Sequence, residues 1–340
     1  MIIPGILFLF GLLCLIKGGD WFVDGASALA RRFHLPELLI GATVVSVGTT
    51  LPEVMVSTIS AVSGHGEISY GNAIGSVICN AALIAAITVA VRPGKVDPKT
   101  LRVPVAFFFA AAAIYCVAAY GMGRFTRPMG LLMLGMFVAY LAANVWQMKN
   151  APAEPEHEEE LMSLGRIVLR LVVGAARAML APLTYLSAAG LLLVVGAALI
   201  ALGANLLVDN GTIIAQAMGV PESVIALTFV ALGTSLPELV TAITSLMKGH
   251  SDLSLGNVVG ANVFNLVLVS GMSVTLAPFE IPQSATLFGI NSSLVLELPV
   301  MLLVMVLLTI PALVRGKLSR VQGVALLCIY AAFCAVQFTM

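Results

Sequence analysis

Charged residues are scarce in this sequence. Lysine and arginine together number 17 of 340 residues, aspartate and glutamate also number 17, and charged side chains make up only 10% of the chain. Hydrophobic residues make up 60%, and the mean hydropathy is +1.05. A soluble domain typically has about 25% charged residues, so this composition excludes an ordinary water-soluble globule. The zero net charge also argues against a nucleic-acid partner, which calls for a basic surface.

Motifs built on cysteine are missing as well. The five cysteines lie in apolar runs, and none forms a CxxC or a cysteine–histidine spacing. We interpret them as small hydrophobic residues rather than as zinc ligands or disulfide partners. HExxH and GxSxG motifs are also absent, so we expect no enzyme and no cofactor.

Long apolar stretches dominate the chain instead. A helix needs about 20 residues to cross a bilayer. The sequence therefore predicts an all-α polytopic membrane protein with ten transmembrane helices, at 2–23, 37–62, 70–91, 103–121, 127–147, 185–208, 222–246, 255–276, 298–314 and 320–338.

One polar stretch divides the ten spans into two groups of five. Residues 1–147 form the first five-helix unit and residues 185–340 form the second. Between them, residues 148–184 are interpreted as a linker, because residues 150–163 are rich in proline and glutamate. Arginines at helical spacing predict an interfacial helix over residues 163–180.

Lysines and arginines indicate the orientation of the spans. If the N-terminus faces outside, fourteen of the 17 basic residues fall in inside loops, and only Arg124 and Arg127 fall in outside loops. This asymmetry follows the positive-inside rule. We expect both termini outside and a cytoplasmic linker, and the minimal loops favour a prokaryotic cytoplasmic membrane.

An internal repeat relates the two units. Residues 36–88 align with residues 221–273 without gaps at an offset of 185, and 19 of 53 positions are identical. Each unit has an odd number of spans, so the second unit must lie upside down relative to the first. Inverted repeats that carry helix breakers at matching positions are typical of alternating-access transporters with a midplane site.

The repeated polar residues predict a cation site. Pro52 and Pro237 lie inside predicted spans, where proline removes a helical hydrogen bond and leaves backbone carbonyls free. We expect discontinuous helices there. The nearby side chains are all oxygen donors, which suit hard cations such as Ca²⁺ and Na⁺. The candidate side-chain ligands are Thr49, Thr50, Glu53, Ser76, Asn80, Thr234, Ser235, Glu238 and Asn265.

Structural roles compete with ion binding for these residues. Hydroxyls can bond to their own helix, and a membrane glutamate can pair with another helix. However, two intramembrane carboxylates at equivalent positions are costly, at roughly 2.5–3.5 kcal/mol each on an insertion scale, which favours an ion-binding role for Glu53 and Glu238. Asn72 and Asn257 are expected to cap or cross-link helices near the site, and a supporting role there is an alternative.

The two copies of the motif resemble a known family. GTTLPE at 48–53, GTSLPE at 233–238, GNAIGSVICN at 71–80 and GNVVGANVFN at 256–265 resemble the α-repeats of the cation/Ca²⁺ exchanger superfamily, in particular its prokaryotic Na⁺/Ca²⁺ antiporters. The resemblance implies that the candidate residues are ion ligands, joined by the backbone carbonyls of Ser46 and Ala231. Two departures, Ala261 where some relatives have serine and Asn265 where some have aspartate, affect one flanking sodium site.

The expected function is exchange of Ca²⁺ for Na⁺ by alternating access, with Glu53 and Glu238 in the central site. Exchange of Ca²⁺ or another divalent cation for H⁺ is the main alternative, although GNAIG at 71–75 differs from the GNAAE-type motif of the H⁺ branch. A cation channel is a further alternative, and a membrane enzyme is the least favoured. The expected partners are the transported ions and the lipid bilayer, and the sequence indicates no obligate protein partner.

Overall fold

The computed structural model describes residues 2–32, 40–149, 188–217, 234–283, 286–287 and 289–337. Three expectations concern residues outside these ranges. They are the linker beyond residue 149 with its interfacial helix, the first part of the second repeat motif, and the carbonyl of Ala231.

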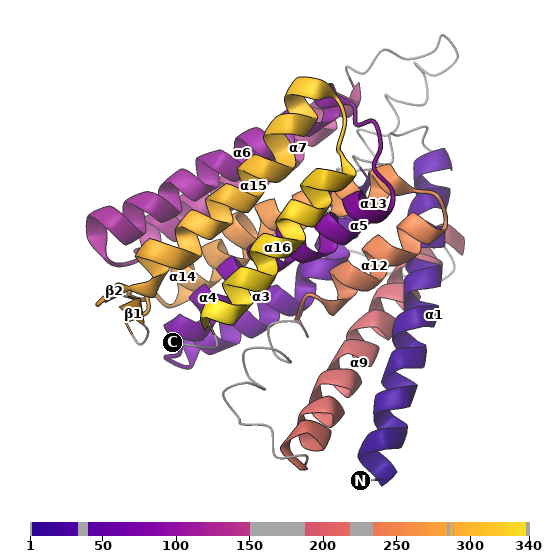
Figure 1. The fold of residues 1–340 in the computed structure, drawn as a ribbon, viewed down its shortest axis with the longest axis horizontal. Coiled ribbons are helices and arrows are strands. Elements are labelled where there is room, and N and C mark those ends of the chain that lie inside the picture. The colour runs from indigo at the N-terminus through magenta and orange to yellow at the C-terminus, as the bar shows by residue number, and fades with distance from the viewer. Residues whose placement is uncertain are drawn as a thin grey trace, which may run out of the picture.

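The described chain is almost entirely helical (Figure 1). Eight of its helices are long and apolar enough to cross a membrane, and two shorter apolar segments, Ala189–Gly203 and Leu236–Met247, fall in the sixth and seventh predicted spans. The protein is therefore an all-helical membrane protein with the predicted set of spans. The one departure from helix among the described elements is a small antiparallel hairpin of strands β1 (Thr286–Leu287) and β2 (Ile290–Asn291).

The first repeat unit consists of α-helices interrupted by short π-helical segments. The α-helices are α1 (Ile2–Arg32), α3 (Ser46–Val62), α4 (Gly66–Cys79), α5 (Ala85–Val91), α6 (Pro98–Cys116) and α7 (Arg127–Lys149). The π-helical segments are η1 (Gly41–Val45), η2 (Asn80–Ile84) and η3 (Val117–Met122).

The second unit repeats this plan. Its α-helices are α9 (Ala188–Ala217), α12 (Leu236–Met247), α13 (Ser251–Phe264), α14 (Ser270–Leu276), α15 (Leu298–Arg315) and α16 (Arg320–Gln337). Its π-helical segments are η6 (Asn265–Val269) and η7 (Ser293–Glu297).

Helices α1 and α9, one from each unit, lie side by side and lean away from the other helices (Figure 1). Glycines line their contact. A Cβ atom on Gly18 would lie 2.8 Å from the backbone nitrogen of Ile200, and one on Gly196 would lie 2.6 Å from that of Phe22. Small residues let two membrane helices approach this closely, so the contact between α1 and α9 depends on glycine.

The centre of the molecule is formed by two equivalent helices, each of which contains a π-helical segment. One is α4–η2–α5 and the other is α13–η6–α14, and both are largely buried among the remaining helices. Their π-helical segments begin at Asn80 and Asn265, which are 185 positions apart. A π-helical turn re-aims the side chains around it and is frequent at functional sites. The π-helical segments therefore single out the two asparagines as candidates for a functional role.

Proline acts differently in the two copies of the GT(T/S)LPE motif. The break expected at Pro52 is absent, because α3 continues through this residue from Ser46 to Val62. A single proline removes one hydrogen bond, and membrane helices tolerate this loss when local adjustments compensate. The irregular turn of this span lies upstream, in η1. In the second copy Ser235 is in a turn and Pro237 lies in the first turn of α12, so the helix does begin there.

Candidate cation site

The two glutamates predicted as ligands come from opposite units and meet in the interior. Glu53 lies on α3 and Glu238 lies in the first turn of α12, and both side chains are completely buried. Helices α3 and α12 contact each other. Helix α3 also contacts η6, and α12 contacts η2, so the π-helical segments that begin at Asn265 and Asn80 border the two glutamate-bearing helices.

Several polar atoms at this site are buried without a hydrogen-bond partner among the described residues. They include both carboxylate oxygens of Glu53, Oε2 of Glu238, and both side-chain polar atoms of Asn80 and Asn265. A buried polar atom without a partner typically costs about 1–3 kcal/mol. Oxygen atoms left unpaired from four separate elements are an arrangement that a bound cation would satisfy.

Hydroxyl groups link the two units around the glutamates. Thr50 Oγ1 donates to Glu238 Oε1 at 3.3 Å, and Ser235 Oγ donates to Ser76 Oγ at 3.3 Å. Thr50, Ser76 and Ser235 are all buried. Each of these hydrogen bonds thus joins a predicted ligand of one unit to a predicted ligand of the other.

Thr49, Thr234 and Ser46 also lie beside this cluster. Thr49 Oγ1 is 3.4 Å from the carbonyl oxygen of Ser46, the backbone group that the family resemblance implicates. Thr234, just before α12, donates to Asn72 Oδ1. The predicted side-chain ligands therefore lie on, or directly beside, elements that contact one another, and all of them are buried except Thr234, which is half-buried. Ala231 lies outside the described residues.

Asn72 and Asn257 cross-link the helices that carry the ligands, as expected. Asn72 Nδ2 donates to Ser57 Oγ at 2.8 Å and to the carbonyl of Glu53 at 3.4 Å. Asn257 is fully buried, and its Oδ1 accepts from Thr49 Oγ1 at 3.2 Å. Repetition at the offset of 185 was the signal for these residues, and the sequence could not show which side chains they contact.

A small hollow borders the site on the side of α1 and α9. Its lining includes Thr49, Pro52 and Pro237 from the site helices and Phe22 and Ile200 from the α1–α9 pair. The paired helices thus cover the proline-bearing face of the site.

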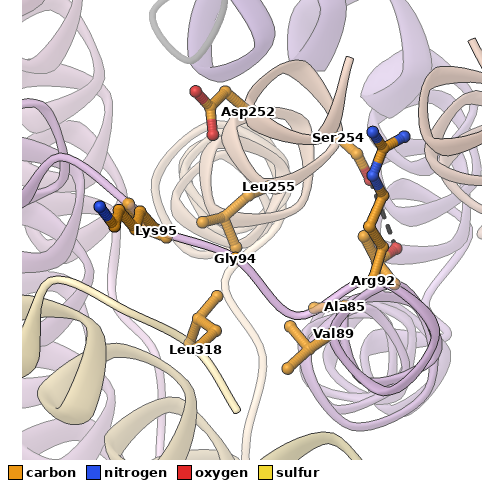
Figure 2. Close-up of a pocket in the computed structure, with 11 residues that line it drawn as sticks. Ala85, Val89, Arg92, Gly94, Lys95, Asp252, Ser254, Leu255 and Leu318 are labelled. Carbon is orange, nitrogen blue, oxygen red and sulfur yellow. Dashed lines mark hydrogen bonds between the residues drawn. The ribbon is translucent and has the colours of Figure 1, made fainter. Parts of the chain in front are cut away.

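A separate pocket lies at the end of the molecule where α5 ends and α13 begins (Figure 2). Arg92, Lys95 and Asp252 are among its lining residues, and none of the predicted ligands lines it. It is therefore distinct from the cation site.

Comparison with known proteins identifies the family. The profile of the family described as "Sodium/calcium exchanger protein" matches residues 3–146 and 188–339. The chain is 33% identical over 288 residues to inner membrane protein YrbG of Escherichia coli (strain K12), covering 84% of this chain and 83% of YrbG. It is 29% identical to the sodium/calcium exchanger MaX1 of Methanosarcina acetivorans, covering 98% of both proteins.

The fold is similar to that of a solved exchanger. The structure of the sodium-calcium exchanger NCX_Mj, from a crystal soaked with Na⁺, matches with a TM-score of 0.76 and 31% identity, covering 98% of this chain and 99% of NCX_Mj. Other NCX_Mj structures come from crystals soaked with Sr²⁺ or Ca²⁺. Because the family profile covers most of the chain and relatives at 31–33% identity match along most of their length, the chain belongs to the sodium/calcium exchanger protein family.

Proposed function

We propose that this protein is an antiporter that exchanges Ca²⁺ for Na⁺ by alternating access. The observation that carries the proposal is the pair of completely buried glutamates, Glu53 and Glu238, which come from opposite units and retain oxygens without a partner among the described residues. Their ionised side chains give the site a formal charge of −2. One Ca²⁺ or two Na⁺ would neutralise it, so the two ions compete for one site.

The neighbouring groups support a hard cation as the substrate. Thr50, Ser76 and Asn80 provide hydroxyl and amide oxygens, and no thiol or imidazole belongs to the set of proposed ligands. Ca²⁺ takes six to eight such oxygen ligands in a flexible geometry. An empty site at charge −2 is costly to pass through a hydrophobic gate, whereas a loaded site is not. This difference would couple the movement of the two ions.

The counter-ion assignment is supported by the named activities of two relatives, MaX1 and NCX_Mj. Two substitutions bear on the number of sodium ions. Ala261 is buried and supplies no hydroxyl, and Asn265 supplies a neutral amide rather than a carboxylate. We infer that Na⁺ binds at the site without a third negative charge.

We infer that the protein lies in a prokaryotic cytoplasmic membrane with both termini outside. Relative YrbG is an inner membrane protein. Two basic loops meet at one end of the structure, where Lys95 pairs with Lys317 through the backbone and Arg320 Nε donates to the carbonyl of Ala90 at 2.9 Å. The positive-inside rule assigns this end to the cytoplasm.

The test is uptake of ⁴⁵Ca²⁺ into proteoliposomes. Vesicles loaded with Na⁺ should take up Ca²⁺ rapidly, and vesicles loaded with K⁺, with or without an acidic interior, should not. Uptake driven by the proton gradient without sodium would overturn the sodium assignment. Uptake into K⁺-loaded vesicles with no counter-ion gradient would indicate a channel.

A further inference from the structure

We propose that Asn72 and Asn257 are positioning residues, each of which orients a hydroxyl ligand of the opposite repeat unit. The proposal rests on the proposed function, because it concerns ligands of the same cation site. Neither asparagine is itself among the proposed ligands.

The hydrogen bonds cross between the units in a matched way. Asn72, in the first unit, accepts from Thr234 Oγ1 of the second unit at 3.0 Å. Asn257, in the second unit, accepts from Thr49 Oγ1 of the first unit at 3.2 Å. Both the asparagines and the threonines are 185 positions apart. The two contacts are therefore one interaction that the inverted repeat produces twice.

This contact has a direct consequence for ion binding. A hydroxyl ligates a cation through an oxygen lone pair, so its proton must point away from the ion. An amide oxygen offers a fixed acceptor for that proton. With the proton held by Asn72 or Asn257, the lone pairs of Thr234 or Thr49 remain available to the site. Such supporting contacts typically change metal affinity by about 10–100-fold when removed.

The two asparagines differ in their further contacts. The Nδ2 of Asn72 donates to Ser57 Oγ and to the carbonyl of Glu53, which fixes the amide with its oxygen toward Thr234. The backbone carbonyl of Asn257 accepts from Ser46 Oγ at 2.9 Å, and its Oδ1 lies 3.4 Å from the same hydroxyl, whereas its Nδ2 has no partner among the described residues.

Close approach of two backbones keeps Asn257 within reach of Thr49. A Cβ atom on Gly41 would lie 2.8 Å from the backbone nitrogen of Asn257, and one on Gly260 would lie 2.6 Å from the Cα of Ala42. Glycine at both positions lets α13 pack directly on η1. The helix packing thus places the backbone of Asn257 close to η1 and to the start of α3, within reach of Thr49.

Double-mutant cycles test the proposal. Asn72→Leu and Asn257→Leu remove each amide at similar volume, and Thr49→Val and Thr234→Val remove each hydroxyl. The dissociation constant of ⁴⁵Ca²⁺ is measured on the purified full-length protein, with thermal melting as a check on folding. We expect each single variant to weaken binding by about tenfold.

The comparison of matched with unmatched double variants distinguishes a positioning role from a general structural role. Each matched double variant should bind Ca²⁺ no more weakly than the one of its two single variants that has the lower affinity. The matched pairs are Asn72→Leu with Thr234→Val and Asn257→Leu with Thr49→Val. The unmatched combinations, Asn72→Leu with Thr49→Val and Asn257→Leu with Thr234→Val, should multiply the two losses, to about a hundredfold.

Three results would overturn the positioning role. They are multiplied losses in the matched pairs, equal behaviour of matched and unmatched pairs, and single asparagine variants that bind like the wild type. If a leucine variant does not fold, the alanine variant replaces it in the same cycle. Failure of the wild-type protein to bind Ca²⁺ would contradict the proposed function instead, so the two failures are distinguishable.

Discussion

Lys248 Nζ lies 2.8 Å from Asp24 Oδ1, and this ion pair joins α12 to α1. The same nitrogen donates to the carbonyl of Asp20 and lies 3.5 Å from its Oδ1. Lys248 caps the C-terminal end of the helix whose first turn carries Glu238. The pair therefore links the position of a proposed ligand helix to the α1–α9 pair that covers the site.

Removing this lysine should weaken the link measurably. The pair is partly exposed, so after solvent screening Lys248→Met should lower the melting temperature by only about 2 °C. Lys17→Met is the matched control, because Lys17 is well exposed and its closest approach to Asp20 is 3.8 Å. The difference between the variants should shrink in about 1 M KCl, which screens the pair without adding a substrate. A larger effect for Lys17→Met would contradict this role.

Neutralising either buried glutamate should abolish most Ca²⁺ binding. Glu53→Gln or Glu238→Gln removes one of the two charges from a buried site, and we expect at least a hundredfold weaker ⁴⁵Ca²⁺ binding, or about 3 kcal/mol. Glu297→Gln is the control, because its carboxylate accepts from Ser292 and Ser293 rather than facing the site. The glutamate pair is not the Ca²⁺ site if both site variants exchange at nearly normal rates.

A side chain added to a glycine at the contact between α1 and α9 should force the two helices apart. The Cβ of Gly196→Val would lie 2.6 Å from the backbone nitrogen of Phe22, and backbone cannot move aside as a side chain can. Overpacking of this kind typically costs about 1–3 kcal/mol. We expect a lower melting temperature and slower ⁴⁵Ca²⁺ exchange. Gly5→Val, on the same helix pair with open space around it, should change neither.

A carboxylate in place of Asn265, at the start of η6, should increase the affinity of the site for Na⁺. Asn265 is fully buried and both its side-chain polar atoms lack partners among the described residues. In Asn265→Asp the site reaches a formal charge of −3, which three Na⁺ neutralise and one Ca²⁺ does not. The sodium concentration that half-saturates exchange should fall by about tenfold. Asn144→Asp, at a buried asparagine of α7 that bonds to its own helix, is the control and should not shift it.

Exchange of three Na⁺ for one Ca²⁺ should carry current. Three sodium ions leave a site of charge −2 at +1, whereas Ca²⁺ leaves it neutral. In Na⁺-loaded proteoliposomes, an inside-positive potential set with valinomycin should therefore speed ⁴⁵Ca²⁺ uptake, because net positive charge leaves in each cycle. Uptake that does not respond to the potential would instead indicate a ratio of two to one.

The sequence was sufficient to predict the helices and to single out the repeated polar residues of the candidate site, because both depend on local patterns. Apolar length locates a span, and the gap-free repeat pairs Glu53 with Glu238. The apolar stretch predicted that the first span ends at Val23, yet α1 continues to Arg32. Charged residues such as Asp24 end an apolar window without ending a helix, since the backbone hydrogen bonds continue beyond the membrane.

Contacts between the two units could not be predicted from the sequence. An alignment shows that Thr49 is equivalent to Thr234, but it does not show that Thr49 bonds to Asn257. That contact depends on how two distant helices pack. The π-helical turns at Asn80 and Asn265 were also missed, because one wider turn leaves no composition signal. At Pro52, the local rule for proline was overridden by the surrounding helix.

The paired π-helical turns also preserve the match between the two units. A π-helical turn is closed by hydrogen bonds from residue i to residue i+5, so it holds about one residue more than an α-helical turn. The two copies align across η2 and η6 without a gap. The wider turn therefore shifts the register of both helices at the same place, and the two units keep this shared geometry although nearly two thirds of the aligned positions differ.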